Sequence, residues 1–239
     1  MKRIMDLTPE QIRIFRHNGF LKLPTRLEDE RIMALKETIL GDTEQVAEPV
    51  ARDAEGRVNR ISGILDRDPI FLETASCPQV TVPLSSLLGP NIEGVRNRHN
   101  HATLNRSSSR QDSFHRDVAQ WTRSVLTVIF YLEDATYDKG GTMVIPGTHL
   151  LPSLEAMHQL EREELVKKAC IVEQAVPVPM PAGGMLAINS LILHRIGTNK
   201  TNETRISMTF GYHSCDELSG QDEKRILIRG ERIYRGNDL

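Results

Sequence analysis

Residues 125–132 read VLTVIFYL, a run of β-branched and aromatic side chains that favours a β-strand. Both alternating faces of this run are largely apolar. Because neighbouring residues of a strand point to opposite faces, such a run predicts a strand that is buried on both sides. The chain is therefore expected to contain a sheet with protein packed against each of its faces.

Further strand-like runs follow this one, separated by glycine and proline turns. We expect strands at residues 142–145, 174–180, 185–188 and 205–213, and a further helix at 154–169. Short strands with glycine turns after a helical start predict an antiparallel barrel of two sheets with helices packed outside. The expected fold class is thus mainly β with flanking helices.

The first 90 residues have helical patterns. Thr8 followed by Pro9 is typical of a helix start, and Gly19 is typical of its end. We expect further helices at residues 28–40, stopped by Gly41, and at 68–76 and 78–88, with a long polar loop at 42–59. The expected organisation is a single domain over residues 1–239. It has a helical part at 1–90 that packs on the barrel, a barrel core at 91–215 and a tail at 216–239.

The composition is that of an ordinary globular protein. The 239 residues are 39% hydrophobic and 26% charged, with a formal net charge of −2, which excludes disordered, collagenous and coiled-coil proteins. This balance gives no global field for nucleic acid or a membrane surface. No apolar run is long enough to span a bilayer, and the N-terminus has no apolar signal-peptide core. Three distant cysteines indicate a reducing compartment. We therefore expect a cytoplasmic protein that binds neither nucleic acid nor membrane.

Two histidines and an aspartate form a candidate metal site. His115 and Asp117 are two residues apart just before the buried strand, so in extended chain both side chains can reach one ion. His194, after the apolar run 188–193, is the best third ligand. Two histidines and one carboxylate on one side of an ion are typical of non-haem Fe(II) oxygenases. The spacing alone also fits a loop histidine that bonds a neighbouring carbonyl.

Arg205 adds a second signal. An arginine inside an otherwise apolar strand is costly unless its guanidinium meets an anion. Beside a metal, the planar guanidinium suits a dicarboxylate that chelates the metal at one end and accepts two parallel hydrogen bonds at the other. The alternative is an ion pair between Arg205 and an internal Asp or Glu.

Three segments together resemble the phytanoyl-CoA dioxygenase family. They are Phe114-His115-Arg116-Asp117, the stretch GGTMVIPGTH at residues 140–149, and Leu193-His194 with Arg205 and the strand that follows. The resemblance extends over roughly residues 8–215 in order and spacing. The GGTMVIPGTH stretch is far more specific than the spacing of His115 and Asp117.

The resemblance implies a double-stranded β-helix (jelly roll, cupin-like) core and an oxygenase that uses Fe(II), 2-oxoglutarate and O2. Arg205 would hold the distal carboxylate of 2-oxoglutarate. Two positions depart from the family pattern, because Arg116 replaces the usual glutamine and Ile196 replaces a small polar residue. The implied site residues are the iron ligands His115, Asp117 and His194, and the cosubstrate-binding residues Arg205, Trp121 and Thr142.

The implied reaction is oxidation of an unactivated C–H bond, most simply hydroxylation, with release of succinate and CO2. Related halogenases have a small residue in place of the carboxylate, so Asp117 favours hydroxylation, with desaturation, cyclisation and epoxidation left open. The odd-numbered face of residues 97–105 is polar. We therefore expect His99, His101 and Asn105 to bind the substrate, a small polar metabolite or natural product.

Two other functions remain open. A cupin-type isomerase or hydrolase could use the same three ligands with Zn or Mn, although it needs neither Arg205 nor the GGTMVIPGTH stretch. A non-catalytic barrel could bind a small ligand or a partner. The C-terminal tail alternates arginine with isoleucine and leucine, which fits an added edge strand, a homodimer contact or a solvated face.

Overall fold

The computed structural model describes residues 6–46, 48–107, 113–118, 125–151, 171–216 and 224–232. The helix expected at 154–169 and Trp121 lie outside these residues. The described α-helices are α1 (Pro9–Asn18), α2 (Asp29–Gln45), α3 (Pro69–Ser76) and α4 (Pro78–Leu88). Short 3-10 helices are η1 (Ile64–Asp66), η2 (Thr148–Leu150) and η4 (Ile171–Gln174). In this part of the chain, no helix is both long and apolar enough to cross a membrane.

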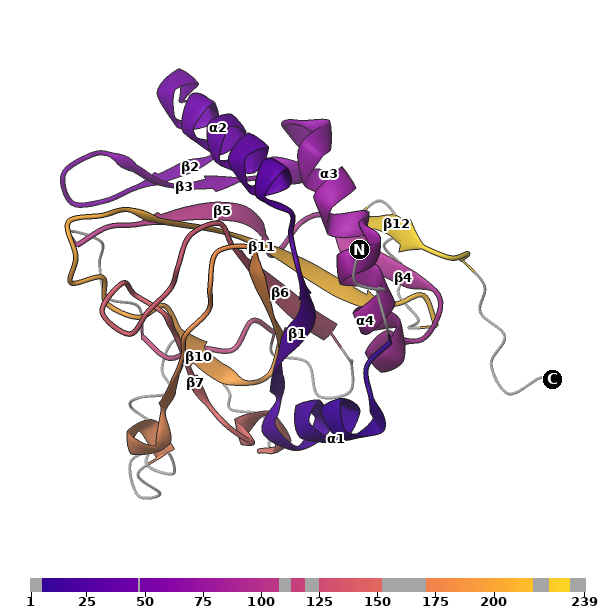
Figure 1. Cartoon of the computed structure of the whole chain (residues 1–239). Helices are drawn as coiled ribbons and strands as arrows, with labels where there is room; N and C mark the ends of the chain where they lie inside the picture. The colour runs from indigo at the N-terminus through magenta and orange to yellow at the C-terminus, as the bar shows by residue number, and fades with distance from the viewer. Residues whose placement is uncertain are drawn as a thin grey trace.

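The strands account for most of the remaining regular structure (Figure 1). They are β1 (Phe20–Arg26), β2 (Val50–Arg52), β3 (Val58–Ser62), β4 (Ile92–Val95), β5 (Asn100–Asn105), β6 (Val125–Tyr131), β7 (Thr142–Ile145), β8 (Val176–Val178), β9 (Gly184–Asn189), β10 (Leu193–Arg195), β11 (Arg205–Ser214) and β12 (Arg225–Arg229). The expected strands at 142–145, 185–188 and 205–213 are thus present. The strand expected at 174–180 is shorter in the structure, where β8 covers only Val176–Val178 and η4 precedes it.

Two antiparallel sheets build the barrel. The larger has the hydrogen-bonded order β1-β9-β6-β11-β5-β3-β2, with β4 beside the end of β11 and β12 beside β4. The smaller has the order β10-β7-β8. Residues from both sheets line one internal cavity, so the sheets face one another. The predicted two-sheet barrel is confirmed.

The large sheet has two chemically different faces, as its β6 strand illustrates. All seven residues of β6 are buried, as predicted. Leu126, Val128 and Phe130 belong to the main hydrophobic core. Thr127 and Ile129, which alternate with them, line the cavity inside the barrel. The period of two in a strand therefore separates the residues that stabilise the fold from those that line the site.

The helices lie against the core face of this sheet. α1 and α4 contact β1, α2 contacts β3, and α3 contacts β12; Figure 1 shows α2, α3 and α4 along one side of the strands. The Tyr212 hydroxyl on β11 donates a hydrogen bond of 2.9 Å to the Ala75 carbonyl on α3. α1 starts and ends as predicted, since Thr8 forms a capping box with Gln11 and Gly19 adopts a φ of 82°.

Several N-terminal predictions are wrong. α2 does not stop at Gly41 but continues to Gln45, because a glycine inside a helix costs only about 1 kcal/mol relative to alanine and the buried stripe of α2 compensates for it. The segment 42–59 is not a loop, since it contains β2 and leads into β3, which form a hairpin beside β5. β1 also interrupts the supposedly helical part. β2 is mostly exposed, so it lacks the apolar alternation by which strands are recognised.

The C-terminal tail supplies an edge strand. β12 pairs antiparallel with β4, as one of the three alternatives predicted. Glu93 on β4 is 3% exposed and forms ion pairs with Arg225 Nη1 at 3.2 Å and Arg232 Nε at 2.5 Å. A buried carboxylate that has arginine partners thus holds the tail on the sheet.

Candidate active site

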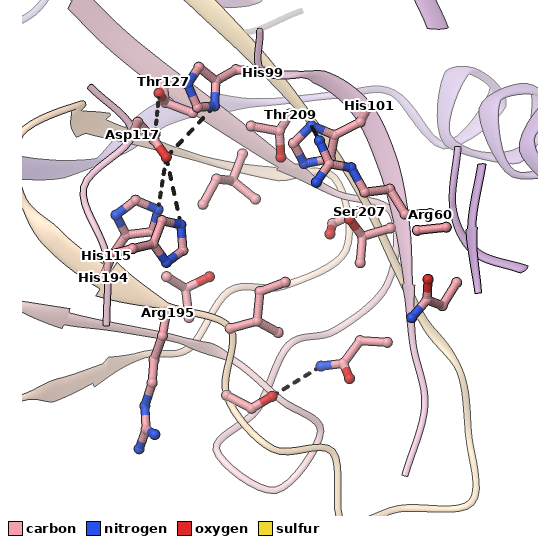
Figure 2. A pocket seen from close by; sticks show the side chains of 18 of the residues that line it. Arg60, His99, His101, His115, Asp117, Thr127, His194, Arg195, Ser207 and Thr209 are labelled. Atoms are coloured by element: carbon pink, nitrogen blue, oxygen red, sulfur yellow. Dashed lines mark hydrogen bonds and ion pairs between the residues drawn. The ribbon is translucent and has the colours of Figure 1, made fainter. Parts of the chain in front are cut away.

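The three predicted metal ligands lie together at one end of the cavity. The ligand atoms of His115, Asp117 and His194 all lie within 4.8 Å of one another. Asp117 Oδ1 is 3.8 Å from His115 Nε2 and 3.5 Å from His194 Nε2. Figure 2 shows the three side chains pointing toward one another. The structure therefore brings together residues that are 77 and 79 positions apart in the sequence (194 − 117 and 194 − 115).

Backbone hydrogen bonds bring the two ligand-bearing segments side by side. His115 and His194 form an isolated antiparallel bridge, with N–H to carbonyl distances of 3.0 and 3.1 Å. The Asp117 N–H donates to the Ser190 carbonyl at 2.8 Å. Residues 113–118 thus run along the chain that leads into β10. Because His194 lies in β10, which pairs with β7, the smaller sheet supports both histidines.

The tautomers of the two histidines follow from their hydrogen bonds. His115 Nδ1 is 3.1 Å from the Ser113 carbonyl, and His194 Nδ1 is 3.1 Å from the Ile192 carbonyl. A carbonyl oxygen can only accept, so each Nδ1 carries the proton and each Nε2 presents its lone pair. This arrangement is typical of metal-binding histidines, whose other ring nitrogen donates to a carbonyl or carboxylate.

Asp117 is a buried carboxylate held in its ionised form. The Thr127 hydroxyl donates to Oδ2 at 2.6 Å and also lies 3.0 Å from the Ser190 hydroxyl. Burial raises the pKa of Asp117, but His194, His99 and the Thr127 hydrogen bond outweigh that effect and leave the pKa below its usual value. Oδ2 is therefore bound to protein, while Oδ1 faces the histidines and is the oxygen available to a cation.

These separations suit a first-row metal ion. Ligand atoms about 2.1 Å from one ion lie about 3.0 Å apart at right angles and about 3.4 Å apart in a tetrahedral arrangement. The two distances from Asp117 Oδ1 to the histidines, 3.5 and 3.8 Å, exceed the tetrahedral separation by about 0.1 and 0.4 Å and the right-angle separation by about 0.5 and 0.8 Å. The donor set of two imidazoles and one carboxylate is the one found in non-haem Fe(II) sites. The residues present therefore fit the implied metal.

Thr148 braces both ligand-bearing segments. Its hydroxyl accepts from the Leu193 N–H at 2.9 Å and donates to the Ile145 carbonyl at 2.7 Å. Its carbonyl accepts from Arg116 Nη2 at 2.7 Å. Leu193 and Arg116 are direct sequence neighbours of the candidate ligands, so one residue of the GGTMVIPGTH stretch binds the backbone of one ligand-bearing segment and a side chain of the other. This contact also gives a local role to Arg116, where the family usually has glutamine.

Arg205 lines the same cavity and has unused donors. It is 1% exposed, and its Nε and Nη1 atoms have no hydrogen-bond partner among the described residues. Its Cζ lies 5.6 Å from the centre of the Tyr131 ring. Burial lowers the pKa of Arg205, while Tyr131 and Glu133 act in the opposite direction. A buried guanidinium with unused donors is expected where an anionic ligand binds.

The remaining predicted residues differ in their surroundings. Thr142 lines the cavity, and its hydroxyl is 2.6 Å from the Tyr131 hydroxyl. His99 has a φ of 46°, and its Nδ1 lies 3.7 Å from Asp117 Oδ1. The Asn105 amide is used structurally, since Nδ2 donates to the Gly197 carbonyl at 3.1 Å. His101 also lines the cavity. Whether these residues bind cosubstrate or substrate stays a prediction.

Sequence reasoning missed Thr127 and Thr148. Thr127 is the only hydroxyl-bearing threonine or serine in VLTVIFYL, and it shares the cavity face with Ile129. A single threonine in an otherwise apolar strand is a usable signal of a buried polar partner. Thr148 stands inside the GGTMVIPGTH stretch, but no sequence pattern says which backbone groups it bonds.

The cavity that joins these groups has a volume of about 590 Å³, within the usual range of about 300–1,000 Å³ for small-molecule sites. Most of its lining residues come from β5, β6, β10 and β11 and from the segments just before and after them. It is therefore large enough for a small cosubstrate and a small substrate together.

Comparisons with known proteins identify the family of the chain and its relatives. A family model described as phytanoyl-CoA dioxygenase (PhyH) matches residues 15–207. The uncharacterized protein Mb1539 of Mycobacterium bovis is 25% identical over 186 residues, which cover 75% of this chain but only 63% of that relative. The L-proline trans-4-hydroxylase of Streptomyces griseoviridis is 22% identical over 223 residues, which cover 82% of each protein.

A solved structure has the same fold. The crystal structure of EctD from S. alaskensis with bound Fe is similar at a TM-score of 0.76 and 16% identity, covering 95% of this chain and 88% of that one. This similarity extends to the helices as well as the barrel, since it covers nearly the whole chain. It agrees with the predicted jelly-roll core.

Proposed function

Because the chain belongs to the phytanoyl-CoA dioxygenase family, we propose that it is an Fe(II)- and 2-oxoglutarate-dependent oxygenase. The observation that carries the proposal is the presence of two features in one cavity. These are the cluster of His115, Asp117 and His194, and the buried Arg205 guanidinium with two unused donors. A metal on three protein ligands keeps open positions for a chelating cosubstrate, and a dicarboxylate has a second end for the arginine to hold.

The residues of this chain have separate tasks in the proposed reaction. His115, Asp117 and His194 hold the metal, and Thr127 fixes the second oxygen of Asp117. Arg205, whose Nε and Nη1 have no hydrogen-bond partner among the described residues, donates to the distal carboxylate of 2-oxoglutarate. With iron and 2-oxoglutarate bound, O2 would be the oxidant, and its reduction would be coupled to conversion of 2-oxoglutarate to succinate and CO2 and to oxidation of the substrate. The protein contributes placement and a cavity in which the reactants meet.

We propose that the substrate is a small polar metabolite and that the reaction is hydroxylation of a C–H bond. The polar lining of the cavity supports this class, because hydroxyls, amides and imidazoles need partners that hydrogen-bond. The trans-4-hydroxylase among the relatives acts on L-proline by its name. This relation makes L-proline one compound to test first. At 22% identity it does not define the substrate of this chain.

The binding of 2-oxoglutarate tests the proposal directly. Adding 2-oxoglutarate to the anaerobic Fe(II) protein should produce a weak visible charge-transfer absorption, and titrating it gives the dissociation constant. Arg205→Met should weaken 2-oxoglutarate binding about 100-fold or more, because two charge-assisted hydrogen bonds of about 1.5–3 kcal/mol each are lost. Arg205→Lys should recover part of the loss, since lysine keeps the charge but not the planar fork.

Arg67 provides the matched control. It is a part-buried arginine outside the cavity lining, and its Nη1 lies 2.8 and 3.0 Å from the two oxygens of Asp42. Arg67→Met should lower the free energy of unfolding and leave 2-oxoglutarate affinity unchanged. An absence of the visible absorption with the wild-type protein, or turnover with Zn and without O2, would instead favour the isomerase or hydrolase alternative.

A further inference from the structure

Two polar residues on the large sheet have no task in the proposed reaction. His101 on β5 and Thr209 on β11 are directly opposite each other in the antiparallel register. Opposite residues of such a pair point to the same face, with Cβ atoms about 5 Å apart, and both side chains line the cavity. Figure 2 shows them together on the wall across the cavity from the metal ligands. A substrate bound in this space would therefore lie between the pair and the metal.

The pair is also separate from the arginine that the proposed function assigns to 2-oxoglutarate. Thr209 lies four residues after Arg205 on β11 (209 − 205), which is about 13 Å along the strand at about 3.3 Å per residue. Ser207 lines the cavity between them. A dicarboxylate that joins the metal to Arg205 therefore leaves His101 and Thr209 for a second molecule.

Arg60 on β3 fixes the tautomer of His101. Its Nη2 is 3.3 Å from His101 Nδ1. A guanidinium can only donate, so Nδ1 accepts and the ring carries its proton on Nε2. Burial, followed by the charges of Arg60 and His99, lowers the pKa of His101 to about 3, so the ring is neutral at neutral pH. His101 therefore has one group left for another partner, the N–H at Nε2, which can only donate.

This N–H is open to the cavity. Nε2 of His101 forms no hydrogen bond within the described part of the chain and is in contact with the cavity space, whereas His99 Nε2 is fully buried without a described partner. The Thr209 hydroxyl likewise lines the cavity and forms no hydrogen bond to a described residue. The wall thus presents an N–H donor beside a hydroxyl that can donate or accept.

From this arrangement we propose that the substrate presents an oxygen acceptor, a hydroxyl or a carbonyl, to His101 Nε2 and the Thr209 hydroxyl, with Arg60 as the residue that positions the imidazole. The inference rests on the proposed function, whose substrate it specifies. A group that can only donate, such as an ammonium, would leave the His101 N–H without a partner and without water, which is costly for a buried donor. The pair therefore selects for acceptors and against amines.

Matched probes test the inference. Protein loaded with Zn(II) and 2-oxoglutarate does not turn over, so weak binding can be followed by ligand-observed NMR. The probes are cyclohexanol with cyclohexylamine, and N-methyl-2-pyrrolidone with N-methylpyrrolidine. Each pair keeps its ring, and both amines are ammonium ions at neutral pH. We expect saturable binding of the hydroxyl and carbonyl members and binding about tenfold or more weaker for the amines. The two acceptor arms show whether a hydroxyl or a carbonyl is preferred.

Variants of the wall identify the residues responsible. His101→Leu and Thr209→Val should each weaken acceptor binding about 2- to 10-fold, as expected for the loss of one neutral hydrogen bond, and should not weaken binding of the amines. His101→Gln keeps an N–H donor and should recover part of the loss. Thr209→Val keeps the shape of its side chain, so it tests the wall even if His101→Leu does not fold.

His149 provides the control for these variants. It lies outside the cavity lining, and its Nε2 is 3.0 Å from the Arg16 carbonyl. His149→Gln should bind all four probes as the wild type does.

The role of Arg60 is tested by proton–nitrogen NMR of protein labelled at the histidine ring nitrogens, with the His101→Gln spectrum assigning the His101 signals. In the wild type, His101 should show the neutral Nε2–H tautomer at neutral pH, and added cyclohexanol should shift its Nε2 signal. Arg60→Met removes the donor to Nδ1, so signals of both tautomers should appear. An arginine with a purely structural role would leave the tautomer unchanged.

Four results would overturn the inference: amines that bind as tightly as their acceptor partners, no saturable binding of either acceptor, wild-type acceptor affinity in both His101→Leu and Thr209→Val, or a wild-type His101 that is protonated at Nδ1. The visible absorption of the Fe(II) and 2-oxoglutarate complex separates this failure from that of the proposed function. If the absorption forms while acceptors show no preference, only the substrate inference is refuted. If acceptors bind at His101 while no absorption forms, the binding wall stands and the oxygenase assignment fails.

Discussion

Removing the hydroxyl of Thr127 should weaken metal binding while the barrel stays folded. Thr127 is 1% exposed, and its hydroxyl donates to Asp117 Oδ2 at 2.6 Å. In Thr127→Val the side chain keeps its shape but cannot donate. Asp117 then loses the hydrogen bond that fixes the orientation of its carboxylate toward the two histidines. The pKa of Asp117 rises toward its usual value.

The size of the effect follows from that one bond. A hydrogen bond to a charged group contributes about 1.5–3 kcal/mol, so the metal-free variant should lose that amount from its free energy of unfolding. Removing the partner that orients a metal ligand typically lowers metal affinity about 10- to 100-fold. Thr127→Ser keeps the hydroxyl and should recover most of the metal affinity.

The assay combines urea unfolding of the metal-free protein with competition for Fe(II) or Zn(II) against a coloured chelator. Thr74 is the matched control, because it is a buried threonine on α3 whose hydroxyl donates to the Ile70 carbonyl at 2.7 Å. Thr74→Val should lower stability by about 1 kcal/mol and leave metal affinity alone. If Thr127→Val is destabilised but keeps metal affinity within about twofold of wild type, the hydrogen bond to Asp117 is structural only and the reasoning fails.

Further expectations concern two glycines, Gly197 and Gly41, and the residues Thr148 and His101. Gly197→Ala should destabilise by about 1–3 kcal/mol in thermal or urea unfolding, because a Cβ there would lie 2.3 Å from the Gly141 carbonyl oxygen, whereas Gly41→Ala should stabilise slightly because nothing lies within 4 Å. Thr148→Val should lower both stability and metal affinity, since the Leu193 N–H loses its buried acceptor. Unchanged metal affinity would refute the role of Thr148 in positioning the metal ligands. The folded pKa of His101, about 3, lies below the unfolded value, so the unfolded chain binds more protons as the pH falls. Between about pH 8 and 5 the wild type should therefore lose up to about 2 kcal/mol more than His101→Gln in urea unfolding.

The sequence predicts the parts of the fold that have strong periodicity or caps. β6 and α1 are correct because a doubly apolar run and a Thr-Pro start each have one physical interpretation. The hairpin of β2 and β3 was missed because β2 is short and mostly exposed and β3 has only two buried apolar residues, Val58 and Ile61. Edge strands of this kind derive their conformation from the neighbouring strand, here β5, rather than from their own composition.

The candidate site also contains some residues that the sequence predicts and others that it does not. The ligand types and Arg205 could be predicted because few residues have their chemistry, and the structure brings His115 and His194 into backbone contact. Thr127 and Thr148 act through hydrogen bonds to partners 10 and 45 residues away in sequence. A common residue type such as threonine does not show in the sequence which distant group it will bind. Only the arrangement of the strands identifies that partner.

The alternation of side chains along the strands explains how this barrel can hold many polar groups in its interior and remain stable. On β11, Phe210 belongs to the main core against the helices, while its neighbour Thr209 lines the cavity. β5 follows the same rule, with Ala102 in the core and His101 in the cavity. Because the two sets point to opposite faces, a change at a cavity position leaves the apolar layer beneath it intact. Exchange of a core residue such as Phe210 instead opens a cavity, at a cost of about 3–5 kcal/mol when an aromatic is cut to alanine. What the barrel binds can therefore change by substitutions on one face of the large sheet, while the other face keeps it folded.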